Sequence, residues 1–199
     1  MQTFTQKTFN IGELKGISAK NIEEHLKLYA GYVNNANLIG EKLGEMYKDG
    51  MDKHTYEASE IVRRFSFEYN GMRNHEIYFA SLSGGGMQLS DSSPLRKKIE
   101  ETQGSFEVWL NIFKTLAMTR GVGWAMLWYD KKEDRLLNSW VDEQHLGQLQ
   151  GCIPILALDM WEHAYVYDYP TSEKKKYIEA FFDNLNWSVI EENFKEATK

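Results

Sequence analysis

The sequence predicts an α+β fold, in which a long N-terminal helical hairpin precedes a C-terminal α/β unit with a three-stranded antiparallel sheet flanked by helices. In the first part, apolar residues recur at helical spacing in two long segments. In the second part, three short apolar runs occur among helical segments, and a polar turn joins two of them. The glycines at 84–86 separate the parts, so we expect domains over 1–86 and 87–199.

The first predicted helix covers residues 18–47. Ser18 can cap its N-terminus, and Glu23 and Glu24 lie early in the helix, where carboxylates oppose the helix dipole. After a break at 48–52 (KDGMD), a second helix is expected over 54–82, which completes the hairpin. The apolar side of the first helix consists of Ile22, Leu26, Tyr29, Val33, Ala36 and Gly40.

The C-terminal half alternates between helical and strand-like segments. The two strands WAMLWYD and LLNSWVD are joined by the turn KKEDR, and the apolar run IPILALD suits a buried third strand. The expected elements are helices over 94–102, 105–120, 174–184 and 187–194, and strands over 124–130, 136–142 and 153–159.

Composition excludes several classes of function. A net charge of −6 argues against a nucleic-acid partner, which requires a basic face. No apolar run approaches the ~18 residues of a membrane span, and the opening residues contain no apolar run long enough for a signal peptide, so we expect neither. Cys152 is the single cysteine, which excludes an internal disulfide and fits a reducing compartment, so we expect a cytoplasmic protein. The high aromatic content of 14% predicts a large aromatic core or subunit interface, or a hydrophobic shell around a reactive centre.

An acid and an imidazole follow the last predicted strand. Asp159 and His163 are four residues apart, just beyond a buried strand, and can converge on one point. Taken alone, the pair is equally consistent with a helix-capping aspartate and a core histidine. The surrounding sequence decides between these interpretations.

ILALDMWEHAYVYDY (155–169), followed by YIEAFFDNLNW (177–187), strongly resembles the C-terminal signature of the iron/manganese superoxide dismutase family. Four further segments resemble family motifs in the same order, so the resemblance spans nearly the whole chain. Met126 departs from the strand motif, which usually has a second Trp there. The four segments are ISAKNIEEH (17–25), YVNNAN (32–37), NHEIYF (74–79) and GVGWAML (121–127).

The resemblance implies a dismutase that converts superoxide to O₂ and H₂O₂ by alternating oxidation and reduction of one ion per subunit. That ion is Mn or Fe, lies between the two domains, and has solvent as its fifth ligand. Three imidazoles and one carboxylate suit these metals, whereas zinc has no accessible redox couple. The implied ligands are His25, His75, Asp159 and His163.

The first ligand has an alternative, because the segment from His25 to Tyr32 is one residue shorter than the commonest family form. Alignment backwards from YVNNAN without a gap puts Glu24 at the ligand position, whereas alignment forwards from ISAKNIEEH gives His25. A seven-residue step leaves two side chains only ~20° apart on a helix, whereas an eight-residue step leaves ~80° unless a π-bulge intervenes. We therefore favour His25.

The resemblance also implies residues around the ion. Tyr32 is expected as the phenol beside the coordinated solvent, although it could be a packing residue, and Gln144 is expected to hydrogen-bond that solvent. In the family, this glutamine can come from either of two positions, which correspond to residues 144 and 71 here. Gln144 together with Gly71 resembles the manganese arrangement more than the usual iron one, so Mn is slightly favoured over Fe. His145 replaces Gln144 if the alignment slips. The expected apolar shell is Phe79, Trp124 and Trp161.

The implied partners are superoxide and a second copy of the chain. Glu162 and Tyr165 resemble the contacts of a homodimer, in which Glu162 hydrogen-bonds the partner's ligand histidine, and a tetramer remains open. Tyr29 and Lys174 replace a histidine and an arginine common near the substrate channel. These departures leave a second hypothesis, a dismutase-fold metal-binding protein without dismutase activity that serves as a structural or interaction protein. A third is an enzyme of this fold that acts on another small oxidant.

Overall fold

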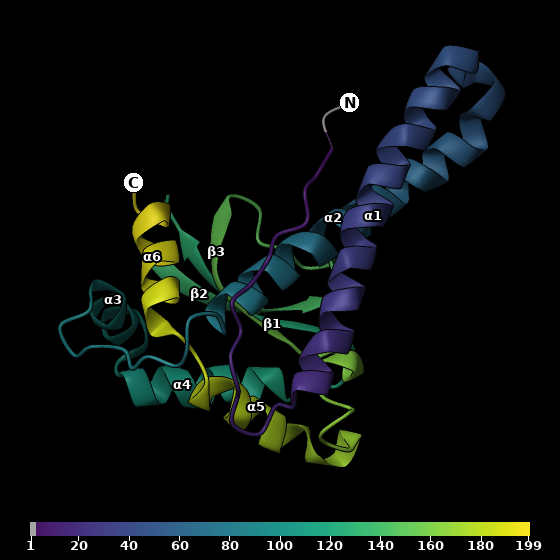
Figure 1. Cartoon of the computed structure of the whole chain (residues 1–199). Helices are drawn as coiled ribbons and strands as arrows, with labels where there is room; N and C mark the ends of the chain where they lie inside the picture. Colours follow the sequence, from purple (N-terminus) through teal and green to yellow (C-terminus); the bar gives the residue numbers. More distant parts are fainter. Residues whose placement is uncertain (1–2) are drawn as a thin grey trace.

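The computed structural model describes residues 3–199 and begins with two long helices. Helix α1 (Ala19–Asp49) and helix α2 (Thr55–Ser81) are joined by a 3₁₀ turn (Met51–His54) and project together from one side of the molecule (Figure 1). Ser18 caps α1 as predicted, because its side chain accepts a hydrogen bond from the backbone N–H of Asn21. The helix ends at Gly50, which has φ of 107°. The predicted helical hairpin is confirmed.

The C-terminal half contains the predicted three-stranded antiparallel sheet. Its strands are β1 (Gly123–Asp130), β2 (Arg135–Asp142) and β3 (Cys152–Asp159), in the order β2-β1-β3. Because β1 is central, all its residues except the last are buried. The register pairs Trp124 with Asp159, so the start of β1 and the end of β3 lie side by side at one end of the strands. This end faces the helical hairpin.

Four helices cover the sheet. In Figure 1, α4 and α5 lie along its lower side and α6 lies beside it. The predicted helix over 105–120 ends three residues early, because Met118 already leaves helical geometry and Gly121 (φ 131°) turns the chain into β1. None of the helices in the described part of the chain combines the length and apolarity needed to cross a bilayer. The bounds are α3 (Pro94–Gln103), α4 (Phe106–Ala117), α5 (Lys174–Asp183) and α6 (Trp187–Ala197).

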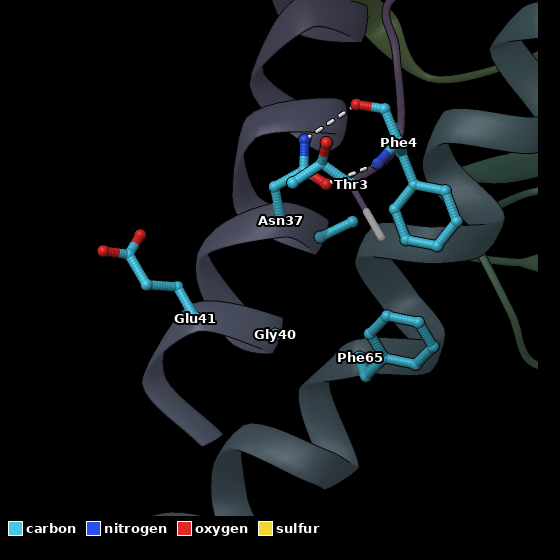
Figure 2. Close-up of a pocket in the computed structure, with 7 residues that line it drawn as sticks. Thr3, Phe4, Asn37, Gly40, Glu41 and Phe65 are labelled. Atoms are coloured by element: carbon cyan, nitrogen blue, oxygen red, sulfur yellow. Dashed lines mark hydrogen bonds between the residues drawn. The ribbon is translucent and has the colours of Figure 1, made fainter. Parts of the chain in front are cut away.

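An extended N-terminal segment runs across the hairpin towards α5. The Asn37 side chain accepts from the backbone N–H of Phe4 at 2.7 Å and donates to the Phe4 carbonyl at 2.9 Å (Figure 2). The pocket drawn there lies between this segment and the two helices, and none of the predicted site residues lines it. Further along, the Asn184 side chain pairs in the same way with the backbone of Lys15. The segment therefore ties the hairpin to the C-terminal half.

One apolar core connects the two halves. It includes Val33 of α1, Phe79 of α2 and Trp124 of β1, all buried. The division into domains over 1–86 and 87–199 stays a prediction.

Candidate metal centre

Four potential metal ligands converge where the hairpin meets this end of the sheet. His25 comes from α1, His75 from α2, Asp159 from the end of β3, and His163 from the 3₁₀ turn Glu162–Ala164. One ligand atom from each lies within 4.8 Å of those from the other three. His25, His75 and Asp159 are fully buried, and the side chain of His163 is 21% exposed. The structure thus brings together all four residues that the sequence predicted.

His25, and not Glu24, points into this cluster. The Glu24 carboxylate accepts from Lys27 Nζ at 2.9 Å and also pairs with Lys20 on the helix surface. Helix α1 is regular between His25 and Tyr32, without a π-bulge, as the seven-residue spacing predicted.

The separations within the cluster suit a single ion. The Nε2 atoms of His25, His163 and His75 lie 3.0, 3.2 and 3.5 Å from Asp159 Oδ2. Nitrogen and oxygen ligands bind a divalent transition metal at about 2.1 Å, so two of them at 90–120° are roughly 3.0–3.6 Å apart. All three measured distances fall in this range.

The protonation of His75 also suits a metal ligand. Its Nδ1 lies 2.6 Å from the Gly71 carbonyl, which can only accept, so Nδ1 carries the proton and Nε2 presents a lone pair. Burial and the nearby His25 lower the pKa of His75 to about 3, so the ring is neutral. The buried Nε2 has no hydrogen-bond partner among residues 3–199 and faces the Asp159 carboxylate. Two acceptors that face each other repel, and a bound cation would remove that repulsion.

Asp159 is held so that one oxygen remains for the cluster. Its Oδ1 accepts the backbone N–H of Trp161 at 2.8 Å, and its backbone carbonyl accepts from the Tyr177 hydroxyl at 2.9 Å. Burial raises the pKa of Asp159, but the imidazoles of His163 and His25 outweigh burial and hold that pKa below its usual value. The carboxylate is therefore ionised, as a ligand must be.

A hydrogen-bonded chain runs beside the cluster. Trp124 Nε1 donates to Gln144 Oε1 at 2.8 Å, and Gln144 Nε2 donates to the Tyr32 hydroxyl at 2.8 Å. An indole N–H can only donate, so it fixes the amide with its NH₂ group towards Tyr32. The Tyr32 oxygen accepts this bond, which leaves its own proton free for another acceptor. Burial and the charge of Asp159 raise the pKa of Tyr32, so the phenol stays protonated.

Gly71 allows Tyr32 to reach this position. A β-carbon at Gly71 would lie 2.5 Å from the Tyr32 ring, closer than real contacts allow. The alternative candidate His145 lies outside the hydrogen-bonded chain and packs edge-on against Phe67, with ring centroids 5.7 Å apart.

Aromatic rings surround the ligands. Phe79 lies 4.8 Å from the His25 ring, Trp124 lies 5.0 Å from His75, and Trp161 stacks on His163 at 5.6 Å, all between centroids. These are the three shell residues expected from the sequence.

Two further residues beside the site were missed by sequence reasoning. Phe67 lies 6.0 Å from Tyr32 and 6.4 Å from Trp161, and the Tyr78 ring lies 5.0 Å from His25. Phe67 occurs on α2 about two turns before the ligand histidine, and this helical spacing was the signal that could have identified it.

Two other expected residues form hydrogen bonds away from the ligand cluster, although the Tyr29 ring stacks on His75 with 6.4 Å between centroids. Tyr29 is fully buried, accepts from the Lys7 backbone N–H at 2.9 Å and donates to Glu76 at 3.3 Å, so it does not line an opening. Lys174 Nζ donates to the Thr119 carbonyl at 2.9 Å.

The fold and the site together are those of a class of protein: a metalloenzyme in which three imidazoles and one carboxylate converge where a helical hairpin meets a sheet. Residues 91–193 match the family profile described as iron/manganese superoxide dismutases, C-terminal domain. The chain belongs to the iron/manganese superoxide dismutase family.

Relatives in this family bear the names of both metals. The superoxide dismutase [Fe] of Aquifex pyrophilus is 38% identical, with 94% of this chain and 88% of the relative covered. The superoxide dismutase [Fe] of Aquifex aeolicus is 37% identical over the same shares. The mitochondrial superoxide dismutase [Mn] of Glossina morsitans morsitans is 34% identical, with 98% and 90% covered.

Proposed function

We propose that the chain converts superoxide to O₂ and H₂O₂ (2 O₂⁻ + 2 H⁺ → O₂ + H₂O₂) with one Mn or Fe ion held by His25, His75, Asp159 and His163. The observation that carries the proposal is the buried His75 lone pair, which has no hydrogen-bond partner among residues 3–199 and is directed at an ionised carboxylate. When bound, the ion supplies the one-electron couple that oxidises one superoxide and reduces the next. The reaction itself is inferred from membership of the family.

The protein's own groups handle protons and solvent. Tyr32 holds a proton on its hydroxyl oxygen that the Gln144 amide does not use, so the phenol can donate it to the nascent peroxide. Gln144 orients that hydroxyl, and the Trp124 indole in turn fixes the amide. The buried rings of Phe79 and Trp124 exclude water, which controls the potential of a bound metal.

Manganese is the metal we favour, although relatives named for iron and for manganese are both similar to this chain. The argument rests on Gln144, which already supplies the amide beside Tyr32. A longer side chain at Gly71 would collide with the Tyr32 ring. A second amide from that position would therefore require Tyr32 to move.

We further propose a homodimer in the cytoplasm. Glu162 is exposed, directly precedes His163, and makes no ion pair within residues 3–199, so its carboxylate is available to a second subunit. Tyr165, the other residue expected at the interface, is 3% exposed and packs against Tyr177 at 5.3 Å within its own subunit, so the dimer proposal rests on Glu162. Light scattering after size exclusion separates monomer, dimer and tetramer. The location rests on the single cysteine and is tested by cell fractionation.

The test of function is metal content followed by activity. Protein loaded separately with Mn and with Fe is assayed for stoichiometric metal and for xanthine-oxidase-coupled dismutation. We expect one ion per subunit and activity in at least one form, higher with Mn. Stoichiometric metal without dismutation in either form would instead support a metal-binding protein that uses the fold for another purpose.

A further inference from the structure

An aromatic wall leads from the partly exposed ligand His163 towards the surface of α2. Trp161 stacks on His163, and Phe67 follows at 6.4 Å from Trp161 and 6.0 Å from Tyr32. The other three ligands are fully buried, so the side of the cluster formed by His163 and Tyr32 is the one nearest solvent.

Arg64 lies on the outer face of this wall. Its guanidinium carbon is 3.5 Å from the centroid of the Phe67 ring, and its side chain is 50% exposed. The guanidinium–Phe67 and Phe67–Tyr32 separations together place Arg64 within about one Debye length, roughly 10 Å at 0.1 M salt, of the Tyr32 ring. At Tyr32 itself the charges of Arg64 and its partner Glu68 act in opposite directions, so the guanidinium acts on an anion on its way in from solvent, before it reaches the phenol.

Glu68 holds Arg64 in this position. Arg64 Nε donates to Glu68 Oε1 at 3.0 Å, and Asn35 Nδ2 donates to the other carboxylate oxygen at 3.4 Å. The Glu68 side chain is only 6% exposed, so an anion from solvent meets the guanidinium before the carboxylate. Within residues 3–199, neither Nη nitrogen of Arg64 has a hydrogen-bond partner. These N–H groups are free to contact an oxyanion.

The global charge makes a local cation useful. With a net charge of −6, the chain as a whole repels a small anion. We propose that Arg64, positioned by Glu68 and the Phe67 ring, is a steering residue that draws superoxide to the aromatic approach beside Tyr32. This inference rests on the proposed function, because it concerns how the substrate of that reaction reaches the site.

The experiment compares Arg64→Gln with Arg63→Gln in the metal-loaded protein. Arg63 is the adjacent residue, is 70% exposed and pairs with Glu60, so its replacement makes the same change of charge about 100° away around α2. Azide serves as the anion probe. Its binding is followed by the change in absorbance of the trivalent metal, at about 20 mM and at about 0.5 M salt. The kcat/KM for superoxide is measured by stopped flow under both conditions.

We expect Arg64→Gln to weaken azide binding and to lower kcat/KM about twofold to fivefold at low salt. The difference should disappear at high salt, Arg63→Gln should match the unmodified protein, and Arg64→Lys should recover most of the loss. Equal values for the two glutamine variants would overturn the proposal. So would a loss that is unchanged by salt, because that would indicate altered packing on Phe67 rather than charge.

Azide binding needs a bound metal but no turnover. If the unmodified protein carries metal and fails to dismutate superoxide, the proposed function fails while the azide titration still decides whether Arg64 attracts anions. Metal content, which both glutamine variants should share with the unmodified protein, excludes loss of the site as the cause. Arg64→Lys keeps a cationic partner for the nearly buried Glu68 and so controls for the unpaired carboxylate.

Discussion

The Tyr32 ring occupies the space into which a β-carbon on Gly71 would project, with 2.5 Å between that carbon and the nearest ring atom. Helix α2 can pass this close to the phenol only because residue 71 has no side chain. The position of the proton-bearing hydroxyl therefore depends on a residue that takes no part in the chemistry.

Gly71→Ala is expected to displace Tyr32 and break its 2.8 Å hydrogen bond from Gln144. Overpacking costs about 1–3 kcal/mol, partly offset by about 1 kcal/mol of helix propensity. We expect a lower melting temperature and reduced activity at unchanged metal content. The control is Gly44→Ala in α1, which has nothing within 4 Å of the added carbon and should raise stability. Equal effects of the two substitutions would contradict this account.

Gln144→Leu removes the buried amide that bonds both Trp124 and Tyr32. The Trp124 indole N–H is then left without an acceptor, which costs about 1–3 kcal/mol of unfolding free energy. Activity should fall as well, because the Tyr32 hydroxyl loses the donor that orients it. Urea unfolding and the dismutase assay measure the two effects. Tyr32→Phe isolates the second effect, and we expect it to reduce activity with less than about 1 kcal/mol of destabilisation.

Asp159→Asn should weaken metal binding on the order of a hundredfold. The Trp161 backbone N–H holds the remaining oxygen, so the new NH₂ group faces the three imidazoles and cannot ligate. Metal content after dialysis against a chelator provides the measurement. Asp183→Asn is the matched control, because this half-exposed carboxylate pairs with Lys15 and lies outside the cluster. It should leave metal content unchanged.

The metal-free protein should lose stability as the pH falls from about 6.5 towards 3. His75 has a pKa of about 3 when folded and about 6.5 when unfolded, so below 6.5 the unfolded state binds the proton first. The stabilisation is complete above pH 6.5 and decreases by about 1.4 kcal/mol per pH unit below it. Burial also lowers the pKa of His25, which adds to the effect in the same direction. Urea unfolding of the apoprotein at pH 5 and 7 is the test, and a flat profile would contradict it.

The fold was predictable because it depends on local pattern, whereas the four candidate ligands came from the resemblance to a family. Ser18 before an amphipathic segment predicted the start of α1, and the seven-residue spacing of His25 and Tyr32 predicted a regular helix between them. Contacts between helices were not predictable in this way. The proximity of Gly71 and Tyr32 depends on how closely α1 and α2 pack, and no spacing within either helix encodes that distance.

The contacts of Tyr29 were not predictable from its place in the motif. With one residue fewer between His25 and Tyr32, the residues of this segment face different directions around α1. The Tyr29 hydroxyl bonds Lys7 and Glu76 rather than facing an opening. The Arg64–Glu68 pair was missed because an i, i+4 ion pair on a helix usually indicates only a solvated surface. Its importance depends on Phe67, which brings the guanidinium close to the site.

The origin of the four ligands on separate halves of the polypeptide has a consequence for the choice of metal in the cell. An ion held by α1 and α2 on one side and by the end of β3 and the following turn on the other would also act as a crosslink between them. If its exchange requires the hairpin to part from the sheet, the N-terminal segment that ties the two together would oppose that opening. The metal bound at the site would then be the one that is abundant while the protein folds, and it would exchange slowly afterwards.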